Sequence, residues 1–502
     1  MSLKKNVVSN FVGQGWSAIM GIAFIPIYIN YLGVEAYGLI GFYTVMQTCL
    51  ILFDMGITQA LMREMAIFKA GAHTPRSIRN LLRSLEVISV FVALLMSALM
   101  LFLSNYISLD WLKGQTLSSQ TIKDAVVLMG FVISLRFIEG VYKGALLGLQ
   151  KQVLVNIISV IIATMRYGIV VLILEFYGSN VQIFFEWQIF SSFLSVVTLI
   201  FFVYKTLPLS GEPSQFSRRA ISGVWKFASG MTGITLLNLL LTQIDKVLLS
   251  TLIDLDEYGY YTLAAVMAGG LALITIPITQ AIYPKLVEHV AQDKKVELVK
   301  LYHQGAQLIT VLITPVALTL IFFSRDIIFL WSGNFQLADK VSPILIPLVF
   351  GNFLNCLLWM PIQLQFAHGY TGLIVKVNAV AVFIFVPILF WVAPRYGAIG
   401  AAWVWALLNV GFISIGVHFM YKRLLTREKW NWYCDDILKQ LFFSILVILL
   451  IYFMTLKLTE GLISKVLIYI FGLCLAICLA SWQSSSIRPL LLDAFNKWKK
   501  FK

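Results

Sequence analysis

Charged side chains stand inside long apolar stretches of this sequence. Segment 236–250 is almost entirely aliphatic, yet Asp245 and Lys246 lie next to each other within it. Adjacent residues differ by about 100° around a helix, so the two side chains are poorly placed to neutralise only each other. We therefore expect at least one of them to face a water-lined cavity or another helix. An ion pair with another helix is the structural alternative.

Further charged residues recur at helical spacing. Arg136, Glu139 and Lys143 follow one another at i, i+3 and i+7 and share one face of a helix, where Arg136 and Glu139 could simply pair. Arg166 has no acidic residue within one turn of its own segment. It is therefore the strongest candidate for contact with an anionic ligand, although Glu186 could also pair with it.

The composition explains these surroundings. The chain has 502 residues, of which 59% are hydrophobic and 12% are charged, whereas soluble domains have about 25% charged residues. Apolar runs of roughly 20 residues, the length that crosses a bilayer, recur along the chain. They are continuous, unlike the alternating strands of membrane barrels. The sequence therefore predicts an all-α integral membrane protein.

The apolar runs predict fourteen transmembrane helices, and the loops between them differ in charge. The expected ranges are 7–32, 38–62, 84–105, 123–147, 154–177, 182–204, 226–252, 259–284, 303–324, 341–363, 372–393, 398–421, 439–457 and 464–483. Most of the 38 lysine and arginine residues fall on the side of the N-terminus, which the positive-inside rule assigns to the cytoplasm. Both termini are expected there. The net charge of +14 then requires no nucleic-acid partner.

Two segments resemble each other at a separation of 221 positions, from 35 to 256. They read EAYGLIGFYTVM over 35–46 and DEYGYYTLAAVM over 256–267, and each follows the first helix of a six-helix group. Apart from a chance match, the explanation is a duplication of six helices, which gives two parallel lobes. The expected parts are an N-lobe over 1–208, a cytoplasmic linker over 209–225, a C-lobe over 226–423, two further helices over 424–484 and a basic amphipathic cytoplasmic tail over 485–502.

Short motifs carry a resemblance to a known family. They are YLGVEAYG at 31–38, LFDMGITQALMREMA at 52–66, GALLGLQKQV at 144–153, QIDKVLLS at 243–250 and EYGYYT at 257–262. With these motifs in this order, the chain resembles the Wzx-type polysaccharide flippases, whose superfamily also holds the MATE drug exporters and the lipid II flippase MurJ. The resemblance covers nearly the whole chain.

The resemblance implies a function and partners. It implies two six-helix lobes around a central cavity that opens alternately to each side of the bacterial inner membrane. The substrate would be an undecaprenyl-diphosphate-linked oligosaccharide, such as an O-antigen repeat unit, moved from the cytoplasmic to the periplasmic leaflet. A polysaccharide polymerase and other assembly proteins are the expected protein partners, beside membrane lipids. The resemblance does not imply which sugars are carried.

The polar residues in the apolar segments favour an anionic or sugar ligand, because arginine binds phosphate through paired hydrogen bonds. The preference over a lipophilic cation is mild, since acidic residues in these segments equal the basic ones in number. The residues expected to bind substrate are Arg63, Arg136, Arg166, Lys246, Asn238, Asn352 and Asn355. Amides such as Asn352 and Asn355 could instead join helices.

Asp54 and Asp245 are the residues expected to couple transport to an ion. Burial in a medium of low dielectric constant favours the protonated carboxyl, so either residue could exchange a proton near neutral pH. A sodium site would use similar oxygens, and the ion stays open. No P-loop occurs, and the five cysteines have no histidine or acidic neighbours at metal-ligand spacing. We expect no catalytic residue, metal or cofactor.

Two rival functions stay open. A MATE-like drug or metabolite antiporter would use the same scaffold for another substrate class. A membrane-embedded polysaccharide polymerase or ligase would be an enzyme of the same pathway, but the longest expected outer connections, 106–122 and 325–340, are short for its chemistry. The sequence therefore favours a flippase that is not an enzyme.

Overall fold

The computed structural model describes residues 3–54, 57–69, 74–208, 213–458, 462–489 and 492. Within these residues every regular element is a helix, and twelve helical segments are long and apolar enough to cross a membrane. The predicted all-α membrane fold is confirmed. The predicted number of fourteen transmembrane helices is not confirmed. The tail predicted over 485–502 lies mostly outside the described residues.

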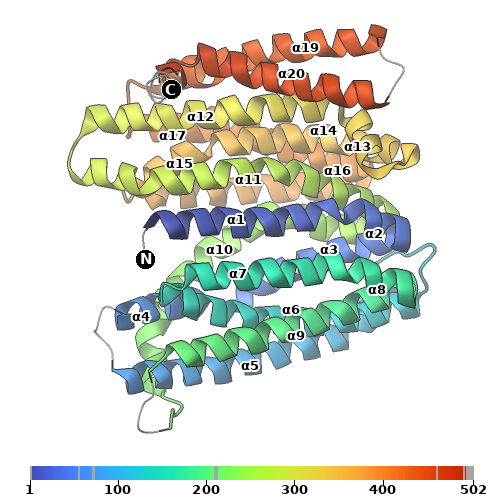
Figure 1. Cartoon of the computed structure of the whole chain (residues 1–502), viewed down its shortest axis with the longest axis vertical. Coiled ribbons are helices and arrows are strands. Elements are labelled where there is room, and N and C mark those ends of the chain that lie inside the picture. The colour runs from blue at the N-terminus through green and yellow to red at the C-terminus, as the bar shows by residue number, and fades with distance from the viewer. Residues whose placement is uncertain are drawn as a thin grey trace, which may run out of the picture. The chain divides into compact units, whose positions relative to one another are not determined.

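The chain divides into two compact units, and the first comprises Met1–Thr262. Its helices are α1 (Leu3–Ala23), α2 (Ile25–Leu32), α3 (Val34–Leu50), η1 (Ile51–Asp54), α4 (Ile57–Lys69), α5 (Pro75–Tyr106), η2 (Ile107–Trp111), α6 (Ser119–Gly148), α7 (Gln152–Ala163), η3 (Thr164–Ile169), α8 (Val170–Tyr177), α9 (Val181–Thr206), α10 (Arg218–Leu252) and the start of α11 (Leu255–Ala291). Helix α6 packs against both α5 and α9, and α1 lies along α7 (Figure 1). Helix α10 packs on α3, α4 and α5.

The second helix of the sequence prediction, 38–62, is divided in the structure. Helix α3 ends at Leu50, η1 carries the chain to Asp54, and α4 starts at Ile57. Asp54 Oδ1 accepts hydrogen bonds from the backbone N–H of Thr58 at 3.1 Å and from its hydroxyl at 2.7 Å. An acidic side chain that accepts from the first turn favours the start of a new helix. Asp54 therefore stabilises the N-terminus of α4.

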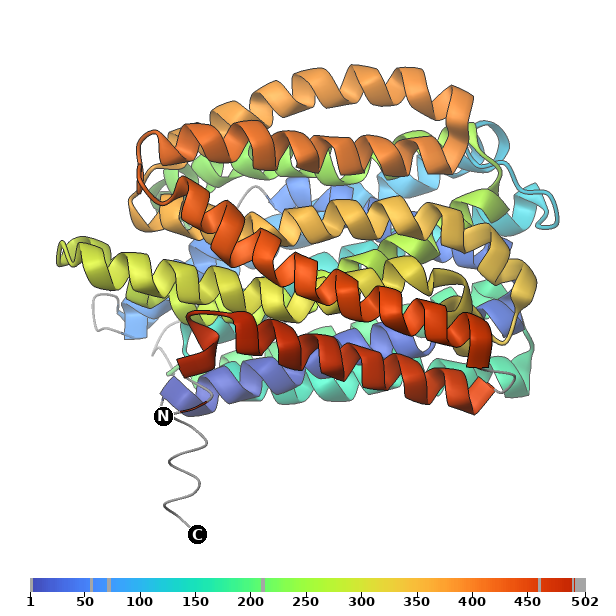
Figure 2. The ribbon, with the colours of Figure 1, turned by 90° about the horizontal axis from the view of Figure 1, so that it is seen from above.

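The second unit comprises Leu263–Lys502. It holds the rest of α11, then α12 (Lys295–Phe322), α13 (Ser324–Ser332), α14 (Phe335–Leu357), α15 (Trp359–Ala367), α16 (Thr371–Gly411), η4 (Phe412–Gly416), α17 (Val417–Tyr421), α18 (Lys429–Asn431), η5 (Trp432–Leu438), α19 (Lys439–Leu458) and α20 (Leu462–Gln483). Helices α19 and α20 lie along each other and both pack on α12 (Figures 1 and 2).

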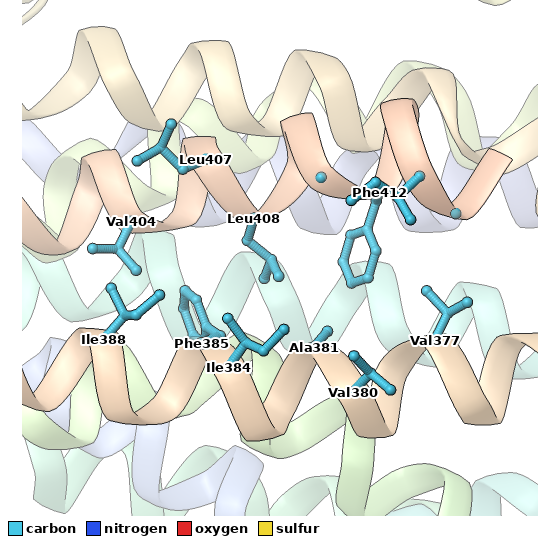
Figure 3. A pocket seen from close by; sticks show the side chains of 13 residues that line it. Val377, Val380, Ala381, Ile384, Phe385, Ile388, Val404, Leu407, Leu408 and Phe412 are labelled. Atoms are coloured by element: carbon cyan, nitrogen blue, oxygen red, sulfur yellow. The ribbon is translucent and has the colours of Figure 1, made fainter. Parts of the chain in front are cut away.

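Helix α16 consists of two helical halves that meet at Gly397. This residue has φ 55° and ψ −143°, a conformation that only glycine adopts readily. The two predicted helices 372–393 and 398–421 correspond to the parts before and after this point. The chain reverses there, and the two parts lie side by side in the close view of Figure 3.

The two copies of the repeated motif contact each other within the first unit. A Cβ atom on Gly38 would lie 2.4 Å from the carbonyl oxygen of Leu255, and one on Gly259 would lie 2.7 Å from the carbonyl oxygen of Val34. Leu255 and Val34 are equivalent residues of the two copies. Such a reciprocal contact is what a local twofold axis produces. The lobe boundaries at 208 and 226 stay a prediction.

The reciprocal contact predicts that Gly38→Ala destabilises the protein. The added methyl group would press on the backbone of Leu255, and overpacking of this kind costs about 1–3 kcal/mol. We expect a lower melting temperature for the purified protein in detergent. Gly15→Ala on α1 is the control, because a Cβ atom there meets nothing within 4 Å. Equal melting temperatures for the two variants would contradict the contact.

Candidate functional site

A cluster of charged side chains lies inside the first unit, where α6, η3 and α9 meet. Glu139 on α6 is 4% exposed, and its Oε1 lies 2.6 Å from Lys143 Nζ. Its Oε2 lies 3.2 Å from Nη2 of Arg166, which also donates to Ser192 Oγ at 3.1 Å. The carboxylate of Glu139 therefore joins two basic residues from different helices.

Arg136 completes this group, which we call the basic cluster and define as Arg136, Glu139, Lys143 and Arg166. Arg136 Nη1 donates to Gln47 Oε1 on α3 at 2.8 Å. Its guanidinium lies over the ring of Tyr43, 5.5 Å from the ring centre, a cation–π contact. The direct partner of Arg136 is thus Gln47 rather than Glu139.

Arg166 has an acidic partner, but this partner is Glu139 and not Glu186. Arg166 is 8% exposed and pairs with Glu139, whereas Glu186 is exposed and forms no ion pair with it within the described residues. Spacing along one helix cannot reveal a partner on another helix, which is why the pair was missed. The structure nevertheless brings Arg136 and Arg166 together around Glu139.

The basic cluster has more positive charge and more donors than its own residues use. Three basic side chains surround one acidic one. The buried Nε atoms of Arg136 and Arg166, and the hydroxyl of Tyr43, have no hydrogen-bond partner within the described residues. Buried donors without partners are costly, and donors on charged groups bind anions strongly. The arrangement is suited to a phosphate or carboxylate group.

A π-helix positions Arg166. In η3 the carbonyl groups of three successive residues, 165–167, are bound by side chains from other helices. Trp187 Nε1 donates to residue 165 at 2.8 Å, Gln188 Nε2 to residue 166 at 3.2 Å and the Tyr28 hydroxyl to residue 167 at 2.6 Å. A π-turn frees carbonyl groups from the regular ladder, and in a membrane these must bind elsewhere. Helices α2 and α9 therefore hold the backbone that carries Arg166.

On α10 the adjacent residues Asp245 and Lys246 form an ion pair, and each of them also has a second partner. Asp245 is 4% exposed and accepts a hydrogen bond from the Tyr261 hydroxyl at 2.5 Å. Lys246 Nζ lies 3.5 Å from Asp245 Oδ1 but donates to the carbonyl oxygen of Thr242 at 2.6 Å. Asp245 is thus buried, whereas Asn238 and Thr242, one to two turns earlier on α10, are exposed.

Tyr261 is a partner that the sequence analysis missed. It lies in the second copy of the repeated motif, within EYGYYT, and this position was the available signal. A phenol beside a buried carboxylate replaces part of the solvation that water would provide.

Three other predicted site residues have partners that do not belong to the basic cluster. Arg63 is exposed and its Nη1 lies 2.6 Å from Glu64 Oε1. In the second unit, Asn352 Nδ2 donates to the carbonyl oxygen of Leu348 on its own helix at 2.9 Å. Asn355 Nδ2 donates to Asn409 Oδ1 at 2.9 Å and so joins α14 to α16. The structure therefore shows the helix-joining alternative for Asn355, and substrate binding by these three residues stays a prediction.

The second unit also contains an apolar groove between the two parts of α16 and η4. Its volume is about 290 Å³, and its lining residues are hydrophobic or glycine. Val377, Ala381 and Phe385 from the first part of α16 face Leu408 from the second part and Phe412 from η4 (Figure 3). Without polar groups, the groove is suited to a hydrocarbon chain rather than to a sugar or a phosphate.

Comparison with known sequences gives two matches. The model of a family described as "Polysaccharide biosynthesis protein" matches residues 3–290. A curated protein of Shigella flexneri, the "Putative O-antigen transporter", is 24% identical over 426 residues, which are 84% of this chain and 99% of that protein.

Solved structures show the same fold. The lipid II flippase MurJ in its inward closed conformation superposes with a TM-score of 0.73 at 16% identity, over 94% of this chain and 97% of MurJ. An inward-facing multidrug resistance MATE family transporter gives a TM-score of 0.66 at 14% identity, over 82% and 96% of the two chains.

The pairing within the basic cluster predicts the effect of Glu139→Gln. This change leaves Arg166 and Lys143 without their carboxylate, and breaking a buried pair costs about 3–5 kcal/mol. We expect a marked fall in melting temperature in detergent, partly reversed when Arg166→Gln is added. Asp339→Asn is the control, since its pair with Arg325 is exposed and contributes little. An unchanged melting temperature for Glu139→Gln would rule out the pairing.

Proposed function

Because the chain belongs to the polysaccharide biosynthesis protein family, we propose that it flips a lipid-linked oligosaccharide across the bacterial inner membrane. The chain is a multi-pass membrane transporter of the polysaccharide type, and the relatives it matches are transporters and flippases, not enzymes. The proposed substrate is an undecaprenyl-diphosphate-linked repeat unit. It moves from the cytoplasmic to the periplasmic leaflet by alternating access of the two predicted lobes, with both termini in the cytoplasm.

The basic cluster is the observation that carries this proposal. A diphosphate has negative charge and many acceptor oxygens, and the cluster offers Arg136 and Arg166 with buried N–H groups that bind no protein acceptor within the described residues. Positive charge in a medium of low dielectric constant attracts an anion and repels a lipophilic cation. The cluster therefore supports a lipid diphosphate over a cationic drug as substrate.

The apolar groove of the second unit supports the lipid part of the proposed substrate. A polyprenyl chain is a long hydrocarbon, and burial of hydrocarbon gains about 25 cal/mol per Å² where water would otherwise be in contact. Within the bilayer that gain is small, so the groove contributes shape rather than affinity. We propose that one segment of the polyprenyl chain lies in this groove during transport.

Ion coupling is proposed for Asp54 and Asp245. Asp245 is buried against Tyr261, and Asp54 accepts from the first turn of α4. Protonation of either carboxyl would remove its negative charge and so weaken the hydrogen bonds that it accepts. A proton or a sodium ion at these oxygens would thereby change the contacts of α10 or α4 during transport.

The first test removes the arginine residues in a strain that lacks the native gene and needs glycan export. Loss of a charged hydrogen bond costs about 1.5–3 kcal/mol, so Arg136→Gln and Arg166→Gln should each reduce export roughly 10- to 100-fold. Lipid-linked glycan should accumulate on the cytoplasmic side. Arg325→Gln, which changes an exposed arginine, should export normally.

Two results would overturn the assignment. Normal export by both arginine variants, at equal amounts of protein in the membrane, would remove the basic cluster from the site. Normal export in the absence of the protein, together with drug resistance on its overexpression, would favour the antiporter.

The second test concerns coupling. Asp245→Asn keeps the shape of the side chain but cannot be ionised, so export should no longer respond to collapse of the ion gradient and should fall at least tenfold. Tyr261→Phe keeps the carboxylate and should retain the response to the gradient. A response that is the same in Asp245→Asn and wild type would leave Asp54 as the remaining candidate.

A further inference from the structure

A second polar network lies in the second unit, where α12, η5 and the segment after α20 meet. Gln307 on α12 is its centre, and it is 2% exposed. Its Nε2 donates to Asp436 Oδ1 at 2.8 Å and to Ser485 Oγ at 3.1 Å. Its Oε1 accepts from the Ser484 hydroxyl at 2.5 Å and from the backbone N–H of Ser486 at 3.0 Å. One amide thus joins three segments.

His303, one turn before Gln307 on α12, contacts two carboxylates. Its Nδ1 lies 2.5 Å from Asp436 Oδ2, and its Nε2 lies 3.2 Å from Glu428 Oε2. Asp436 is fully buried in η5. Asn431 Nδ2 donates to Glu428 Oε2 at 2.7 Å and fixes that carboxylate. We call His303, Gln307, Glu428, Asp436 and 484–486 the histidine network.

The contacts of His303 with two carboxylates bear on its protonation state. A neutral imidazole has one N–H and one lone pair, so it can donate to only one of two carboxylates. The lone pair would then face the other carboxylate oxygen, which is repulsive. An imidazolium donates at both nitrogens and satisfies both acceptors. The observed geometry therefore matches an imidazolium that donates to both carboxylates.

We propose that the histidine network is a proton-binding latch that fastens the C-terminal helices α19 and α20 to α12. With the proton bound, His303 holds Asp436 and thereby η5, which runs directly into α19. Gln307 holds the segment that leaves α20. Without the proton, Asp436 is a buried carboxylate beside an imidazole that cannot satisfy both neighbours, and the contact of η5 with α12 is weakened.

Several titratable groups lie around His303. From η5, His303 is faced by Asp436 and, further out, by Asp435. From the α17–α18 connection it is faced by Glu428, while Lys429 instead contacts His418 Nδ1 at 3.0 Å. On α12 the neighbouring titratable group is Tyr302, whose hydroxyl bonds the hydroxyl of Tyr421 at 2.7 Å.

These neighbours give the latch a net negative environment. Within the described residues no ion pair connects the network to α14, α15 or α20. The contacts of His303 with both carboxylates are satisfied while both ring nitrogens donate, and one of the two is lost when the imidazole releases its proton.

The latch is independent of the basic cluster and of the substrate. Helices α19 and α20 follow the predicted six-helix lobes, so the network fastens the appended pair to the second unit. A change of pH on the side of the network would therefore alter how firmly this pair is held, without altering Arg136 or Arg166.

The direct test is nuclear magnetic resonance of the full-length protein in detergent with ¹⁵N-labelled histidine side chains. The protein has five histidines, and His303→Gln assigns the signal of His303. We expect an imidazolium signal for His303 at pH 7.5, where ordinary histidines are neutral. Asp436→Asn should move the loss of this signal about one pH unit lower or more.

Melting temperatures between pH 5.5 and 9 give a second readout. Wild type should lose stability as the His303 signal becomes neutral, and His303→Gln should lack that step. Gln307→Ala is the matched control, because it removes the amide contacts but keeps the proton site, and it should lower the melting temperature at every pH without removing the step. A neutral His303 at pH 7.5, or the same step in His303→Gln, would overturn the latch. Should His303→Gln fail to fold, Asp436→Asn and the wild-type spectrum decide the matter.

Discussion

The pairing of charges that are buried away from water is the constraint on which this structure depends. A carboxylate or guanidinium in hydrocarbon loses its hydration, and only a nearby opposite charge or a set of hydrogen bonds can compensate. Glu139, Asp245 and Asp436 each meet this requirement through a side chain on another helix or turn. The contacts that compensate for the lost hydration of these groups also join the helices to each other. Burial of charge and packing of helices therefore depend on the same side chains.

The three sites differ in what remains after this compensation. Around Glu139 the basic residues exceed the acidic ones, which leaves capacity for an anion. Around His303 the acidic residues exceed the basic ones, which leaves capacity for a proton. Asp245 is held by the neutral phenol of Tyr261 and by the ammonium group of Lys246. The excess positive charge of the basic cluster thus suits an anion, and the excess negative charge of the histidine network suits a proton.

Composition and apolar run lengths were sufficient to predict an all-α membrane protein, because crossing a bilayer requires long helices. Helical spacing also placed Arg136, Glu139 and Lys143 on one face. It could not supply partners from other helices, and so it missed the pairing of Arg166 with Glu139 and of Asp245 with Tyr261. The start of α4 at Ile57 was missed for a related reason: the predicted helix 38–62 is mostly apolar, and only the capping contact of Asp54 reveals the new helix start.

The contact between Gly38 and Gly259 bears on the origin of the chain. Because Val34 and Leu255 occupy equivalent places in the two copies, each copy meets the other through the same surface. If the predicted duplication is correct, this surface would have joined two separate polypeptides of half the length as a homodimer interface. The acidic residues of the two copies now differ, since the first copy has Glu35 alone and the second has the pair Asp256 and Glu257.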